Sequence, residues 1–289
     1  NRLCQEDVII MDGGMGTEIL RRGEETTLPL WSARVLLDNP MFVKRIHEDY
    51  IRAGAEIIIT NTFRTTKRTF TRAGIGSRAR EAVLTACKIA KEAIREVDPG
   101  HEVYIAGSIA PLEDCYRPDL VPHEQSLKKE HEEYTKNLKE GRVDFLLAET
   151  MNTSKEAIFA LNAAKKTGLP YAVSFCCNKD GKLLSGENMH NVIEALKTFN
   201  PLFISINCFS PFWVLPIVKK LKKITDIPIG VYAHGDGRPD DDQGWKFTGN
   251  ITAERYLKYA KEWIENGVQI IGGCCGTNPE YIKKLSILW

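Results

Sequence analysis

The chain has 289 residues, of which 43% are hydrophobic and 27% charged, and its formal net charge is +1. This balance gives no electrostatic reason to expect nucleic acid or an anionic membrane as a partner. No apolar run reaches the roughly 20 residues of a membrane-spanning helix, and the first residues lack an apolar signal segment. We therefore expect a cytoplasmic protein that buries a large core.

Short apolar runs rich in β-branched residues recur along the whole chain. They are nearly continuous rather than alternating, which is typical of strands buried on both faces of a parallel sheet. Eight such strands are predicted, over residues 8–11, 56–60, 103–107, 143–148, 171–175, 202–206, 227–231 and 268–271.

Segments with apolar residues at helical spacing separate these strands. Helices are predicted over residues 42–53, 78–97, 127–140, 154–167, 189–198, 211–225 and 252–267. Alternating strands and helices indicate right-handed βαβ units, and eight strands favour a closed (β/α)8 TIM barrel over an open sheet. We predict an α/β protein with one barrel domain over 1–289. The polar segment 234–250 follows the seventh strand and is expected to be a mobile loop on the active face.

The residues with the most distinctive chemistry fall directly after predicted strands. Active sites of (β/α)8 barrels lie at the carboxyl ends of their strands, so these segments should meet on one rim. The five segments are Asp12-Gly13-Gly14, Asn61-Thr62, Glu149-Thr150, Asn207-Cys208 and Gly272-Gly273-Cys274-Cys275-Gly276.

Three of the eight cysteines, Cys208, Cys274 and Cys275, form the strongest signal. Three thiolates with an open fourth position are typical of a catalytic zinc site, and flanking glycines permit the sharp turn that adjacent ligands need. The alternative is that they are small buried core residues. We interpret Cys176 and Cys177 as packing residues.

The remaining cysteines, Cys4, Cys87 and Cys115, are expected to be inert. His47 lies in a predicted helix, and we interpret it as structural. His234 lies beside the loop that follows the seventh strand, and its role stays open.

Together these motifs resemble the homocysteine S-methyltransferase family, over residues 8 to about 279. The family holds zinc with a Cys after an Asn on strand six and with the Cys pair of Gly-Gly-Cys-Cys-Gly on strand eight. Further segments extend the match: Asp12-Gly13-Gly14-Met15-Gly16-Thr17, Leu30-Trp31-Ser32-Ala33, Thr60-Asn61-Thr62-Phe63 and Gly107-Ser108-Ile109.

The resemblance implies zinc-dependent methyl transfer to the thiolate of homocysteine, which gives methionine, with Cys208, Cys274 and Cys275 as the ligands. Asp12 and Glu149 would hold the amino group of homocysteine through charge-assisted hydrogen bonds. The remaining expected substrate contacts are the backbone at Gly13, which could approach the substrate closely, backbone amides near Ser108 for the carboxylate, and Asn207.

The resemblance also bears on the methyl donor, for which we expect a small cationic molecule, S-methylmethionine or S-adenosylmethionine. Trp31 resembles the members that use S-methylmethionine, and an aromatic face stabilises a sulfonium by cation–π attraction. Those members carry a Tyr-Pro-Asn-Ser-Gly-Glu type segment after strand seven. Here Tyr232-Ala233-His234-Gly235-Asp236-Gly237 replaces it, which puts the donor in doubt.

Two other functions remain open from the sequence. The chain could be the homocysteine- and zinc-binding module of a larger corrinoid- or folate-dependent methionine synthase system. It could also methylate a different thiol or a selenol.

Overall fold

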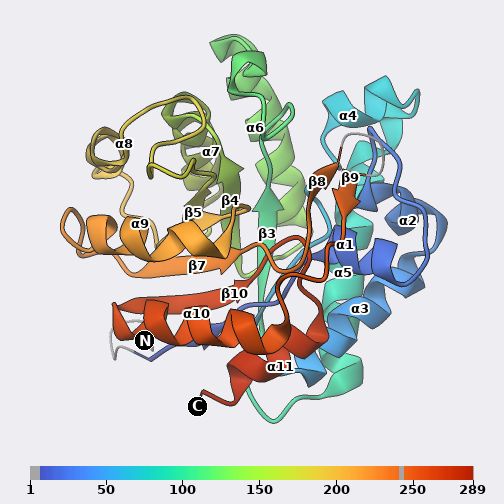
Figure 1. Cartoon of the computed structure of the whole chain (residues 1–289). Coiled ribbons are helices and arrows are strands. Elements are labelled where there is room, and N and C mark those ends of the chain that lie inside the picture. The colour runs from blue at the N-terminus through green and yellow to red at the C-terminus, as the bar shows by residue number, and fades with distance from the viewer. Residues whose placement is uncertain (1–6, 241–243, 289) are drawn as a thin grey trace.

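The computed structural model describes residues 7–240 and 244–288. Its centre is a parallel eight-stranded sheet in the order β1-β10-β7-β6-β5-β4-β3-β2 (Figure 1). The strands are β1 (Ile9–Ile10), β2 (Ile57–Ile59), β3 (Tyr104–Ile109), β4 (Phe145–Met151), β5 (Tyr171–Phe175), β6 (Ile204–Asn207), β7 (Ile229–Ala233) and β10 (Val268–Gly273).

The two end strands of this order meet and close the sheet into a barrel. Met11 bridges Ile57 in parallel register. The Glu56 N–H donates to the Ile10 carbonyl at 2.8 Å, and the Asp12 N–H donates to the Ile57 carbonyl at 2.9 Å. The predicted (β/α)8 barrel is confirmed.

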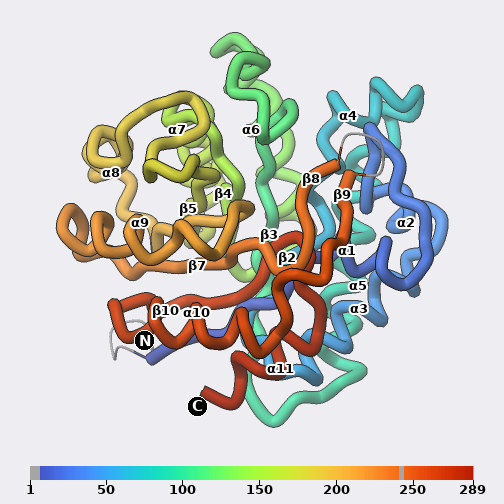
Figure 2. Tube along the Cα trace, in the orientation of Figure 1, coloured from blue at the N-terminus to red at the C-terminus, as the bar shows by residue number. Residues whose placement is uncertain are grey.

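Helices surround this barrel (Figures 1 and 2). They are α1 (Met15–Arg21), α2 (Ser32–Asp38), α3 (Pro40–Arg52), α4 (Lys67–Arg72), α5 (Ala79–Val97), α6 (Glu124–Glu140), α7 (Ser154–Thr167), α8 (Met189–Leu196), α9 (Val214–Leu221), α10 (Ala253–Glu265) and α11 (Pro279–Ser286). Threonine hydroxyls cap three of them, each at 3.2 Å: Thr66 accepts from the Thr69 N–H, Thr153 from the Glu156 N–H and Thr252 from the Arg255 N–H. In the described part of the chain, no helix is long and apolar enough to cross a membrane.

Alternation of side chains along each strand divides the core into two parts. Ile9 and Met11 belong to a small cluster with Phe145 and Phe203, whose rings meet edge to face at 6.0 Å. Ile10, which lies between them in the chain, belongs to the large cluster shared with the helices. The small cluster therefore fills the barrel, and the large one joins the barrel to its helical shell.

The structure differs from the sequence prediction in several elements. Helices α1, α2, α4 and α11, with 6 to 8 residues each, were not predicted. Cys4 lies outside the described residues.

The segment 234–250 is not simply a loop, because it contains the antiparallel hairpin of β8 (Arg238–Asp240) and β9 (Gly244–Lys246). The prediction of a loop is wrong there for a physical reason. Trp245 is buried, and its indole N–H donates to the Asp236 carbonyl at 2.9 Å. The Asp236 carboxylate accepts from the N–H groups of Gly249 and Asn250. The hairpin is thus anchored at its base.

Candidate metal and substrate site

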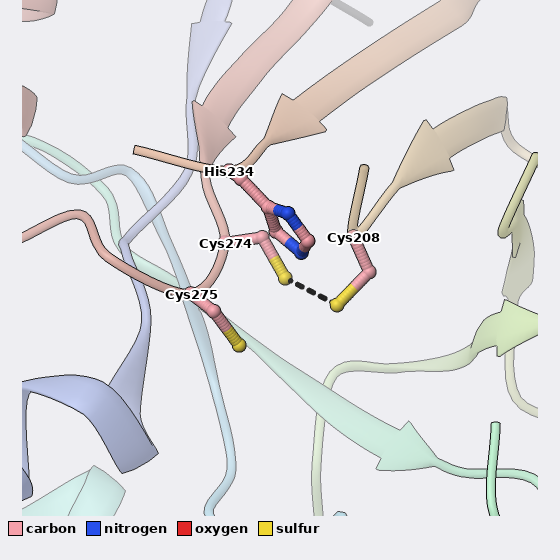
Figure 3. A group of neighbouring side chains, drawn as sticks. All are labelled: Cys208, His234, Cys274 and Cys275. Carbon is pink, nitrogen blue, oxygen red and sulfur yellow. Dashed lines mark hydrogen bonds between the residues drawn. The ribbon is translucent and has the colours of Figure 1, made fainter. Parts of the chain in front are cut away.

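Three thiols and one imidazole converge at the carboxyl ends of strands β6, β7 and β10. The ligand atoms of Cys208, His234, Cys274 and Cys275 all lie within 4.8 Å of one another. Figure 3 shows the His234 ring and the Cys274 and Cys208 side chains turned toward one another, with 3.0 Å between these two sulfurs. Three of these residues are the predicted ligands, and His234 adds a fourth donor.

Cys208 directly follows β6, and its own backbone leaves the extended conformation of the strand. Cys208 has φ of 60°, a left-handed conformation that a non-glycine residue rarely adopts and that costs about 1–3 kcal/mol. Its N–H donates to the Tyr232 carbonyl of β7 at 3.4 Å. The Cys176 thiol donates to the Cys208 carbonyl at 3.5 Å. Cys176 therefore supports a candidate ligand from behind, in agreement with a packing role.

The turn after β10 places the adjacent pair Cys274 and Cys275. The Thr277 hydroxyl donates to the Cys274 carbonyl at 2.7 Å. Gly276 has φ of 79°, and a Cβ there would lie 2.1 Å from the Asp236 carbonyl oxygen, so only glycine fits. The Gly235 N–H donates to the Cys275 carbonyl at 2.9 Å, which ties this turn to the segment carrying His234.

The four donors suit a metal ion in their chemistry and their spacing. In a tetrahedral zinc site with Zn–S bonds of about 2.3 Å, neighbouring sulfurs lie about 3.8 Å apart. The group is compact enough for this arrangement. Burial lowers the pKa of His234 to about 3, so its imidazole is neutral and keeps a lone pair for a metal.

The thiols need a cation to ionise in this place. Contact with the Cys274 thiol, followed by burial, raises the pKa of Cys208 well above its ordinary value. The pKa values of Cys274 and Cys275 are raised as well. Without a metal the three groups are thiols at neutral pH, and a divalent cation would hold them as thiolates.

Two buried carboxyl groups, Asp12 and Glu149, lie near the thiols. One oxygen of Asp12 accepts from the Ile59 N–H at 2.8 Å, while Oδ1 is buried without a hydrogen-bond partner among the described residues. Burial, assisted by the nearby Glu149 charge, raises the pKa of Asp12 well above its ordinary value. Glu149 accepts a hydrogen bond from Ser108, and burial raises its pKa to about 7.

A cavity of about 250 Å³ opens beside these groups. Of the nine residues predicted for the site, six line it: Gly13, Trp31, Glu149, Cys208, Cys274 and Cys275. The other three lie behind the wall. Asp12 holds β2, Ser108 contacts Glu149, and the Asn207 amide accepts from the Thr150 N–H at 3.1 Å and the Ser174 hydroxyl at 2.7 Å.

These hydrogen bonds give Asn207 a positioning role that the sequence alone did not suggest. Thr150, which follows Glu149, has φ of 58°. Asn207 donates to the Thr150 hydroxyl at 2.8 Å as well as accepting from its N–H. The amide thereby holds the strained backbone that carries Glu149.

Several cavity residues were not predicted. Tyr116 points its hydroxyl at both the Cys208 sulfur, at 3.6 Å, and His234 Nε2, at 3.5 Å. Trp245 also lines the cavity and meets the His234 ring edge to face at 4.8 Å. The departure of segment 232–237 from the family pattern was the available signal for His234. Tyr116 lies in an irregular connection, where no periodicity marks it.

The other described Cys and His residues singled out in the sequence lie outside the donor group. Cys177 and Cys87 are buried and outside the donor group, as expected of packing residues. His47 is fully buried in α3, consistent with a structural role. Cys115 lies on the cavity wall, where burial raises the pKa of its thiol to about 12, in keeping with the expected inert thiol.

Fold and site together define a class: a (β/α)8 barrel enzyme whose strand ends carry a thiol-rich group able to hold a metal. The family model described as homocysteine S-methyltransferase matches residues 9–288. The chain therefore belongs to the homocysteine S-methyltransferase family and is a methyltransferase.

Named relatives agree with this assignment. A homocysteine S-methyltransferase of Bacillus subtilis (strain 168) is 33% identical, with 96% of this chain and 93% of the relative covered. A selenocysteine methyltransferase of Astragalus bisulcatus is 28% identical, covering 96% of this chain and 90% of the relative. The metallated form of the homocysteine methyltransferase MmuM from Escherichia coli matches with a TM-score of 0.86 at 25% identity, covering 99% and 98% of the two chains.

Proposed function

We propose that this protein transfers a methyl group from S-methylmethionine to the sulfur of homocysteine, with zinc held by Cys208, Cys274 and Cys275. The observation that carries the proposal is the convergence of three thiols beside a cavity that also presents a buried carboxyl group. Homocysteine offers the matching chemistry, since it has one thiol and one ammonium group.

Without substrate, the imidazole of His234 would supply the fourth donor, and the homocysteine sulfur would take that place. Zinc bound there would lower the pKa of the substrate thiol so that the thiolate forms at neutral pH. Glu149, on the cavity wall, binds the substrate ammonium group, and the buried Asp12 carboxyl near it adds negative charge, so that the ammonium group stabilises the ionised forms of both. Asn207 and Ser108 act through Glu149 by fixing its position.

The methyl transfer is a substitution at carbon. The thiol proton leaves to solvent, and the homocysteine sulfur forms a bond to the methyl carbon. The bond from that carbon to the sulfonium sulfur breaks, and its electron pair stays on the donor, which becomes a neutral thioether. The protein contributes by holding both substrates in line, since positioning supplies much of the rate in such reactions.

The size of the cavity favours the smaller cationic donor. A cavity of about 250 Å³ lies below the roughly 300–1,000 Å³ typical of sites for drug-sized ligands. S-methylmethionine lacks the nucleoside that S-adenosylmethionine carries. Trp31 and Trp245, from opposite ends of the chain, line the cavity, and aromatic rings stabilise a sulfonium by cation–π attraction.

The test is a donor panel with zinc-loaded protein and homocysteine, scored by methionine formed. We expect turnover with S-methylmethionine and less with S-adenosylmethionine. Activity that requires an added corrinoid protein or methylfolate would contradict the proposal and support a module of a larger system.

A selenol is the second candidate acceptor, favoured by the selenocysteine methyltransferase relative. Selenocysteine offered in place of homocysteine tests it. A higher kcat/KM with selenocysteine than with homocysteine would identify the selenol as the acceptor and would leave the assignment of the donor unchanged.

A further inference from the structure

We propose that Arg64 binds the carboxylate of the methyl donor, so that the enzyme selects a sulfonium that is also an amino acid. The inference rests on the proposed function and extends it to the donor side of the cavity. It depends on an arginine that lines the cavity and that has no counter-ion among residues 7–240 and 244–288.

Arg64 follows β2 and lines the cavity next to Phe63. Among the described residues it has no ion-pair or hydrogen-bond partner in the protein, and its guanidinium lies 5.7 Å from the centre of the Phe63 ring. The next arginines along the chain differ, because Arg68 and Arg72 both pair with Glu113, at 3.0 and 2.6 Å. An unpaired guanidinium at a cavity wall is suited to a planar anion, which it can bind with two parallel hydrogen bonds.

The loop that carries Arg64 is fixed to the loop that carries Trp31. The Ser32 hydroxyl donates to the Asn61 side-chain oxygen at 2.6 Å, and the Asn61 amide donates to the Ser32 carbonyl at 3.1 Å. The segments that carry Arg64 and Trp31 are therefore joined by hydrogen bonds.

The hairpin completes this side of the cavity. A Cβ built on Gly244 would lie 2.0 Å from the Trp31 ring, so ring and hairpin backbone are in direct contact. Trp245 of the same hairpin also lines the cavity. Aromatic faces suited to a cation and a guanidinium suited to a carboxylate thus occur on linked loops, which matches an amino acid with a sulfonium side chain.

The acceptor has its own polar contacts elsewhere. Its ammonium group is assigned to Asp12 and Glu149, which belong to the ends of β1 and β4. Arg64 belongs instead to the loop after β2, while Trp31 lies in the connection between β1 and α2 and the hairpin follows β7. This separation predicts that loss of the guanidinium affects donor binding and spares the acceptor.

The experiment pairs a change in the protein with a change in the donor. Arg64→Met keeps an unbranched apolar stem and removes the guanidinium and its charge, and the donors are S-methylmethionine and its carboxamide. For the unaltered enzyme we expect a lower KM with the carboxylate. In Arg64→Met the KM for S-methylmethionine should rise on the order of tenfold to a hundredfold, the effect of losing hydrogen bonds to a charged group, and the preference for the carboxylate should disappear.

Control variants separate this effect from general damage. Arg78→Met removes an arginine that pairs with the adjacent Glu81 on the surface, and it should leave both KM values unchanged. Arg64→Lys keeps the charge without the planar fork and should be intermediate. Zinc content and the KM for homocysteine should stay at the level of the unaltered enzyme in all variants.

Two results would overturn the inference. One is a rise in the KM for homocysteine with no change for the donor, which would assign Arg64 to the acceptor. The other is an Arg64→Met enzyme that still prefers the carboxylate over the carboxamide. Tryptophan fluorescence titration with S-methylmethionine measures donor binding without turnover. If S-methylmethionine binds more tightly than its carboxamide but no methionine forms, the proposed function is wrong and the assignment of Arg64 to the carboxylate still holds.

Discussion

Replacing Glu149 with glutamine should remove a measurable part of the pH dependence of stability. The side chain is buried, and burial raises its pKa from 4.5 to about 7 in the folded protein. Glutamine has the same shape, can still accept a hydrogen bond from Ser108 and does not ionise. The variant therefore removes only the ionisation of this group.

The sign follows from the two pKa values. A raised pKa means that the folded protein keeps its proton over a range where the unfolded chain has lost it, so stability falls as pH rises through this range. At about 1.4 kcal/mol per pKa unit, the native enzyme should lose about 2–3 kcal/mol more than Glu149→Gln between roughly pH 5 and pH 8.

The assay is urea denaturation of both proteins, reduced and metal-free, at several pH values across this window. The difference between the two free energies of unfolding reports the ionisation of Glu149 together with its electrostatic effect on its neighbours, chiefly Asp12, whose pKa the Glu149 charge raises. Parallel curves would refute the reasoning, since they would mean that Glu149 is ionised in the folded protein at neutral pH despite its burial.

The remaining predictions concern the metal and the hairpin. Cys208→Ser should lower zinc affinity by more than about a hundredfold and abolish methyl transfer. The control Cys176→Ser should keep its zinc, as measured by metal analysis after dialysis. Equal zinc content in the two variants would exclude Cys208 as a ligand. His234→Ala should weaken zinc binding on the order of tenfold but preserve turnover at saturating zinc, and unchanged affinity in a chelator competition would remove His234 from the site. Gly244→Ala should displace Trp31 and raise the donor KM, because the added Cβ would lie 2.0 Å from the Trp31 ring. The backbone φ of 76° at Gly244 should also cost the variant about 1–3 kcal/mol in stability. An unaltered KM would show that the hairpin does not shape the donor site.

The barrel was predictable because its strands carry a strong local signal. Runs such as 56–60 and 268–271 are apolar on both faces, and they become β2 and β10 of the closed sheet. The hairpin β8–β9 has no such signal. Its strands have 3 residues each, and it is held by Asp236 and by burial of Trp245, contacts that no local pattern reveals.

The site was predictable where its chemistry is carried by residue type and less so where it depends on orientation. Cys208, Cys274 and Cys275 meet as the strand-end rule requires. Asn207 also ends a strand, but its amide turns toward Thr150 and Ser174, contacts that no local pattern in the sequence indicates.

X-ray absorption at the zinc edge, with and without homocysteine, tests the central claim most directly. The account predicts three sulfur ligands and one nitrogen in the zinc-loaded protein alone, and four sulfur ligands once homocysteine is added. A sulfur count that does not change with homocysteine, or a protein that fails to retain zinc when fully reduced, would contradict it.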